Sequence, residues 1–129
     1  MRKFKTRPFA RFANREGITD GALCDALERA GRGLVDADLG GGVIKQRVAR
    51  RGKGRSGGFR VIAVFRRQEC AFFVHGFAKS DRDNLRRREL GALKALADQL
   101  LGLDEPGLKA MLANGTISEV ICDAKAIRE

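Results

Sequence analysis

Three segments rich in Val, Ile and Phe follow one another in the middle of the chain, and they constrain its fold more than any other feature. They are VIKQRVAR, FRVIAVFRR and CAFFVHGFAK, and each alternates in part with period two, which is typical of β-strands. A Gly-rich stretch at 51–58 and a turn near 67–69 separate them. Because such short connections join antiparallel neighbours, we expect a three-stranded meander.

Helical periodicity flanks this meander on both sides. Before it, the pattern predicts a helix over PFARFANRE that ends at Gly17, and a second helix that Thr19 or Asp20 caps. After it, apolar residues at helical spacing predict a helix from Asp83 to Leu101. A shorter helix is expected to begin at Pro106, since proline is tolerated in a first turn.

The remaining segments complete an α+β domain. We expect RKFKT at 2–6 to be an edge strand, LVDADLGGG to be a loop shaped by Asp36 and Asp38, and TISEVIC to be a last strand or an extended tail. The expected architecture is a small antiparallel sheet with two N-terminal helices and the C-terminal helices packed on one face. The chain, at 129 residues, is the size of a single domain, and we expect residues 1–129 to form one.

Positive charge is concentrated in one part of the chain. Residues 43–67 hold nine Lys and Arg and no acid, whereas residues 16–42 hold two bases and six acids, in a chain of net charge +10. Like charges that lack compensating acids repel one another unless a polyanion binds there, and nucleic acid is the usual polyanion. The alternative is a solvated basic face that maintains solubility.

The cysteines and the absence of targeting features bear on location. Cys24, Cys70 and Cys122 are odd in number and widely spaced, so they predict free or buried thiols and neither a disulfide framework nor a zinc site. The chain has no apolar run of membrane-spanning length, and its basic start lacks the apolar core of a secretory signal. We therefore expect a cytoplasmic protein that uses no metal.

Strand periodicity predicts which side chains share a face. Phe73, His75, Phe77 and Lys79 are expected on one face of the third strand. On the second strand, Arg60 and Arg66 are expected to share a face with Ile62 and Val64. On the first strand, Lys45 and Arg47 alternate with Ile44, Gln46 and Val48. Cations that project from neighbouring strands onto one face are suited to an RNA backbone.

Three motifs in this order and spacing, GGGVIKQRVAR, GKGRSGGFR and HGFAKSDRDN, resemble the RelE-type toxins of bacterial toxin–antitoxin systems, in particular the HigB-like branch. The resemblance covers nearly the whole chain, from FKTRPFARFA to ISEV. It implies a small α+β fold and a ribosome-associated mRNA endoribonuclease that attacks with the 2′-OH of the RNA and inhibits translation. It also implies a cognate antitoxin, often a helix-turn-helix protein, and no cofactor.

The resemblance also implies a set of site residues. The catalytic positions that match the family are Arg60, Lys79, Arg82, Lys45 and Arg47. The other cations of the basic segment are expected to contact RNA phosphates: Arg50, Arg51, Lys53, Arg55 and Arg66. The chain departs from the family in having no tyrosine, and Arg86 lies near the position of the family's C-terminal tyrosine.

Two questions stay open at this stage. His75 is a candidate general acid or base, but its apolar neighbours favour a packing role, and core packing is favoured over base stacking for Phe59 and Phe77. The second question is function, because fold does not fix it. The alternative to an endoribonuclease is a non-catalytic module that binds RNA or DNA, or a toxin of this scaffold that acts on a protein target, as ParE-type proteins do.

Overall fold

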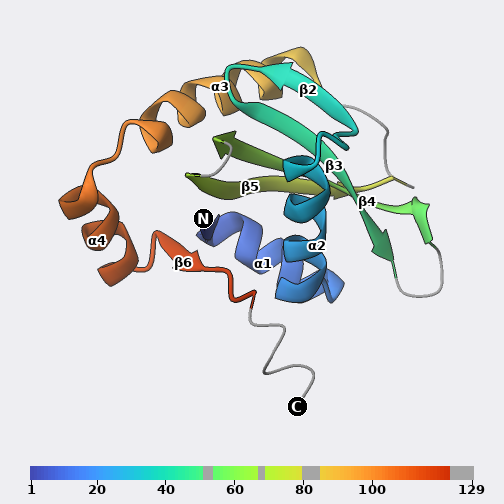
Figure 1. The fold of residues 1–129 in the computed structure, drawn as a ribbon, viewed down its shortest axis with the longest axis horizontal. Coiled ribbons are helices and arrows are strands. Elements are labelled where there is room, and N and C mark those ends of the chain that lie inside the picture. The colour runs from blue at the N-terminus through green and yellow to red at the C-terminus, as the bar shows by residue number, and fades with distance from the viewer. Residues whose placement is uncertain (51–53, 67–68, 80–84, 123–129) are drawn as a thin grey trace.

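The computed structural model describes residues 1–50, 54–66, 69–79 and 85–122. None of the helices among these residues is long and apolar enough to cross a membrane. Figure 1 shows the elements, which in chain order are β1 (Arg2–Thr6), α1 (Arg7–Glu16), α2 (Asp20–Gly31), β2 (Ala37–Gly40), β3 (Val43–Arg50), β4 (Gly54–Arg66), β5 (Cys70–Ala78), α3 (Arg87–Leu101), α4 (Glu105–Ala113) and β6 (Ile117–Glu119). The predicted meander is confirmed as β3, β4 and β5, and β4 already begins within the stretch expected to be a loop.

The strands form one mixed sheet in the order β2-β3-β4-β5-β1-β6. Four neighbouring pairs are antiparallel, but β1 runs parallel to β5. The α+β class is confirmed, whereas the purely antiparallel sheet is corrected at this pair. The expectation of an edge strand at 2–6 is also wrong, because β6 pairs with the other side of β1. Five residues do not reveal which distant segments will pair with them.

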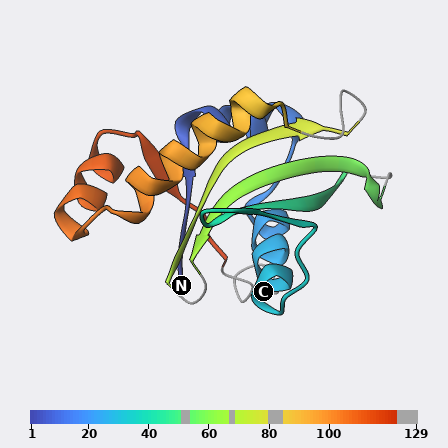
Figure 2. The same ribbon diagram turned by 90° about the horizontal axis from the view of Figure 1, so that it is seen from above.

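Helices cover both faces of the sheet, and each face has its own apolar core. One core joins α1 and α2 to residues such as Val61, Ala63 and Phe73, and the other joins α3 to Val64 and Phe72. Figure 2 shows α2 and α3 on opposite sides of the strands. The expectation of helices on one face is therefore wrong. The continuous apolar runs of β4 and β5 explain why, since both faces of these central strands need cover.

A β-bulge in β5 changes which side chains face the same way. Ile62 of β4 pairs with His75, but the next residue, Ala63, pairs with Phe73, so Val74 is an extra residue in β5. Phe73 consequently joins the core beneath α1 and α2, while His75 lies on the face that α3 partly covers. The prediction that Phe73 and His75 share a face is wrong, because a bulge interrupts the period of two.

The segment expected to be a loop before the meander contains a short strand. β2 pairs with β3 through a hairpin whose three glycines, Gly40, Gly41 and Gly42, have φ of 87°, 63° and 84°. Residues with side chains rarely adopt such positive φ values, which explains the glycine run. The side chain of Asp38 accepts a hydrogen bond from the Gly40 amide at 2.9 Å, so its loop-shaping role is confirmed.

Two of the three cysteines form a disulfide. Cys24 of α2 is bonded to Cys122, which follows β6, and Cys70 is a free thiol. The expectation of three thiols is wrong for this pair. The two residues lie 98 positions apart, so their proximity depends on the completed fold and no local spacing indicates it.

Candidate functional site

Two rows of side chains cross β3, β4 and β5 on the face that α3 partly covers. Cross-strand pairing places Lys45, Ile62 and His75 in the first row and Arg47, Arg60 and Phe77 in the second. Adjacent strands lie about 4.8 Å apart, so each row spans about 10 Å between its outer backbones. Side chains from three strands therefore lie close to one another on this face.

Three of the cations meet at one carboxylate, that of Asp36. Its Oδ1 lies 2.8 Å from Arg47 Nε, and its Oδ2 lies 3.7 Å from Lys45 Nζ and 4.0 Å from Arg60 Nε. We call Lys45, Arg47, Arg60 and Asp36 the Asp36 cluster. Its net formal charge is +2, because one carboxylate offsets one of three cations. Such a cluster can bind an anion and still keep its own cations close together.

The cations of the Asp36 cluster differ in how far they reach into solvent. The Arg60 side chain is 6% exposed and that of Lys45 is 14% exposed, whereas that of Arg47 is 50% exposed. Arg60 also donates a hydrogen bond to the Phe59 carbonyl at 3.5 Å. The buried guanidinium is therefore held in place by the protein, whereas Arg47 is the most accessible cation of the three.

His75 and Phe77 lie at the β5 end of the two rows. His75 is partly exposed, its Nε2 lies 3.7 Å from Glu89 Oε2, and its ring is in contact with that of Phe77. Glu89 also accepts a hydrogen bond from the Arg86 amide at 2.9 Å, which ties it to the first turn of α3. The imidazole thus faces the same surface as the cations, with a carboxylate beside it.

The two phenylalanines considered for base stacking are both core residues. Phe59 is 2% exposed and packs on the α1 and α2 side, whereas Phe77 is 5% exposed and packs on the α3 side. The expectation of core packing is confirmed for both. Stacking on a base would require either ring to leave its core first.

The other predicted site residues lie in three groups. Lys79 is exposed just beyond β5, and its amide donates to the Gly58 carbonyl at 2.9 Å, two residues along β5 from the partner of Arg60. Arg66 is at the far end of β4, 3.4 Å from Glu69, about 20 Å along the strand from Arg60. The rest, in backbone or side chain, lie outside the described residues: Arg50, Arg51, Lys53, Arg55 and Arg82.

Asp36 is the residue of this site that the sequence did not reveal. Its interpretation as a loop-shaping residue is wrong, since it lies among three cations just before β2. The charge distribution did contain a signal, because a segment of nine bases without an acid must draw its counter-charges from elsewhere. The preceding acidic segment is the nearest source.

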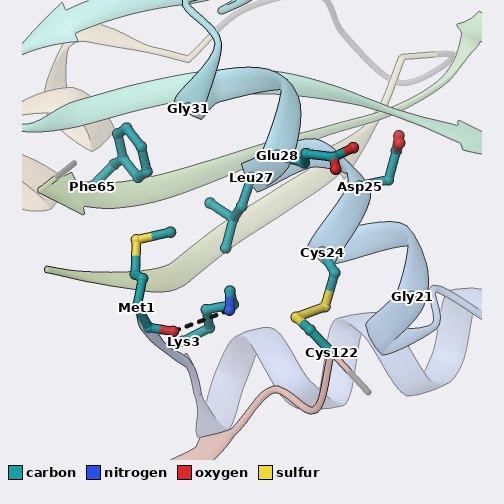
Figure 3. Close-up of a pocket in the computed structure, with 10 residues that line it drawn as sticks. All are labelled: Met1, Lys3, Gly21, Cys24, Asp25, Leu27, Glu28, Gly31, Phe65 and Cys122. Atoms are coloured by element: carbon teal, nitrogen blue, oxygen red, sulfur yellow. Dashed lines mark hydrogen bonds between the residues drawn. A yellow bond between two sulfur atoms is a disulfide. The ribbon is translucent and has the colours of Figure 1, made fainter. Parts of the chain in front are cut away.

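A cavity of about 770 Å³ lies on the other side of the molecule, beside α2 (Figure 3). Leu27 and Phe65 form part of its apolar wall, Asp25 and Glu28 are acidic, and the disulfide lies at one side. No cation of the Asp36 cluster lines it. The cavity is therefore separate from the face that carries the cations.

Comparison with known proteins relates the chain to a described family. A family model described as the RelE toxin of the RelE/RelB toxin–antitoxin system matches residues 1–120. No curated protein matches the chain, and no solved structure matches it either.

Proposed function

The chain belongs to the RelE family of toxins from toxin–antitoxin systems, and from this premise we propose that it inhibits translation by cutting ribosome-bound mRNA. A toxin of such a system has a cognate antitoxin as its partner. We propose that this antitoxin is a helix-turn-helix protein and that an acidic segment of it covers the sheet face that carries the Asp36 cluster. We also propose that the toxin acts in the cytoplasm, where it meets ribosomes.

The observation that carries the proposal is the convergence of three cations from β3 and β4 on one point, at Asp36, of the sheet face that α3 partly covers. A protein that only binds RNA gains affinity from cations spread along the backbone. Cleavage instead requires charge at the one phosphoryl group where negative charge develops. Fixed donors that converge on one point favour the second kind of site.

The proposed reaction is attack by the 2′-oxygen of the RNA on the adjacent phosphorus. The bond from 2′-oxygen to phosphorus forms, the bond from phosphorus to the 5′-oxygen breaks, and a 2′,3′-cyclic phosphate and a 5′-hydroxyl result. Arg60 and Arg47 stabilise the charge on the phosphoryl oxygens. A base accepts the 2′-OH proton and an acid supplies one to the leaving oxygen, and Lys45, His75 and Lys79 are the candidates for these two roles.

The test is cleavage of mRNA by purified protein with and without ribosomes, read as new 5′ ends. Arg60→Lys keeps the charge but loses the planar donor pair, so we expect cleavage to fall by about 10²-fold or more while circular dichroism shows a folded protein. Lys109→Ala, which removes an exposed cation of α4, is the matched control and should cleave as the wild type does.

The alternatives predict different results in this assay or in cells that express the protein. A non-catalytic RNA-binding module would bind RNA and produce no new 5′ ends under either condition. A toxin that acts on a protein target would arrest growth with intact mRNA. In a cleaving protein, a pH–rate profile that loses one inflection in His75→Gln would identify His75 as the group that transfers the proton.

A further inference from the structure

Asp36 occupies a position that a phosphate-binding site would not ordinarily give to an acid. Its carboxylate is 12% exposed and has cations on both oxygens, with Arg47 at Oδ1 and Lys45 and Arg60 at Oδ2. A carboxylate repels a phosphodiester, so direct contact with RNA is not a plausible reason for its presence. The contacts point instead to an effect on the three cations.

The backbone of Asp36 is fixed from the opposite side of the sheet. Its amide donates to Gln46 Oε1 at 2.7 Å, and the Gln46 side chain is itself anchored by bonds to the carbonyls of Ala26 at 2.8 Å and Leu34 at 3.1 Å. Gln46 is 1% exposed. The backbone that carries the carboxylate is thus fixed, through the Gln46 side chain, to α2 and the segment after it, independently of any bound RNA.

Asp36 supplies a shared counter-charge to the three cations. Three positive charges within reach of one point repel one another, and long side chains lose conformational freedom when they are fixed. A rigid carboxylate between them offsets the repulsion and sets the direction of each side chain. With Asp36 in place the cluster still has a net charge of +2, which leaves attraction for a phosphodiester.

We propose that Asp36 is a positioning residue: it holds Lys45, Arg47 and Arg60 in the arrangement in which they meet one phosphoryl group, and it does not touch the RNA. This inference rests on the proposed function. Removal of a cation of the site would lower both the RNA affinity and the cleavage rate, whereas removal of Asp36 should change these two quantities differently. Loss of the carboxylate misplaces the cations and slows cleavage, but it removes a negative charge and therefore does not weaken RNA binding.

The chain offers a matched control in Asp38, which lies two residues further on. Asp38 is exposed, and its carboxylate accepts a hydrogen bond from the Gly40 amide. Asn at this position keeps that bond and removes the same charge from the same hairpin. Asp36→Asn and Asp38→Asn therefore differ in their contact with the cations and not in the change of net charge.

The experiment measures cleavage of mRNA under single-turnover conditions, and binding of a short labelled single-stranded RNA, for both variants. We expect Asp36→Asn to cleave about 10- to 100-fold more slowly at saturating protein concentration, the usual cost of a misplaced catalytic group. Its RNA affinity should be equal to or tighter than that of the wild type. Asp38→Asn should match the wild type in cleavage rate.

Three outcomes would overturn the inference: an unchanged cleavage rate in Asp36→Asn, a faster rate, or loss of binding and cleavage in the same proportion. If Asp36→Asn does not fold, Asp36→Glu decides, because a carboxylate displaced by one methylene should slow cleavage and leave binding intact, and an unchanged rate counts against the idea. A wild type that binds RNA but cleaves no mRNA overturns the proposed function, and this inference with it, whereas the outcomes above leave the proposed function standing.

Discussion

Loss of the disulfide between Cys24 and Cys122 should lower the stability of the fold substantially. The bonded residues are 98 positions apart, so the bond closes most of the chain into one loop. In the chain-entropy description, closing a loop of this length stabilises the native state by about 4.7 kcal/mol. With about 2.1 cal/mol/K of unfolding entropy per residue, 129 residues give about 0.27 kcal/mol/K, so the midpoint should fall by about 17 °C.

The assay is thermal unfolding by circular dichroism with and without reductant. Cys24 packs partly against the core of the α1 and α2 face, so Cys24→Ala adds a packing cost to the loss of the bond. The reductant-induced shift of the wild type isolates the bond itself. Cys70→Ala is the control: it leaves the disulfide intact and should show the same response to reductant as the wild type, while Cys24→Ala should show none.

Peptide mapping checks that the bond is present before reduction and absent after it. If the linked peptide disappears on reduction and the midpoint of the wild type does not move, the entropic reasoning is refuted. A shift in Cys24→Ala on adding reductant would likewise show that the response comes from some other cause.

Two further predictions concern a packing contact and a thiol. Gly76→Ala should lower the free energy of unfolding in urea by about 1–3 kcal/mol, because its Cβ would overlap the Phe12 ring, which is itself packed against Phe9 and Phe59. A variant that also carries Phe12→Leu should recover part of this stability. An unchanged unfolding midpoint in Gly76→Ala would contradict the contact. Burial raises the pKa of the Cys70 thiol, so the thiol stays protonated at neutral pH. Its alkylation by iodoacetamide should be slower at pH 7 than that of glutathione and should accelerate as the solution becomes alkaline. A reaction as fast as that of glutathione at pH 7 would contradict this.

The strands of the central meander could be predicted because their signal is local. Each contains enough β-branched and aromatic residues to be recognised from its own sequence, and their connections are short. The assumption that failed was that one face would be open. Phe72 and Phe73 are both buried, on opposite faces, so an uninterrupted apolar run indicated cover on two sides rather than one.

The errors share a physical cause, which is dependence on partners distant in sequence. β1 looked like an edge strand because the strands on either side of it come from residues 70–73 and 117–119. The disulfide and the β-bulge before His75 also depend on contacts between residues that are distant in sequence. At the candidate site, the cations were evident from composition, but their meeting point at Asp36 required the β2–β3 hairpin, which four residues and a glycine run did not reveal.

The place of β1 in the sheet also sets an order of events during synthesis. The first strand of the chain pairs with β5 on one side and with β6 on the other, so both of its partners are made long after it. While the ribosome extends the chain, β1 has no strand partner until residues 70–73 have emerged. Its second edge remains unpaired until residues 117–119 follow. The sheet that carries the cations is therefore complete only after residues 117–119 have emerged, and a nascent chain shorter than this lacks its last strand.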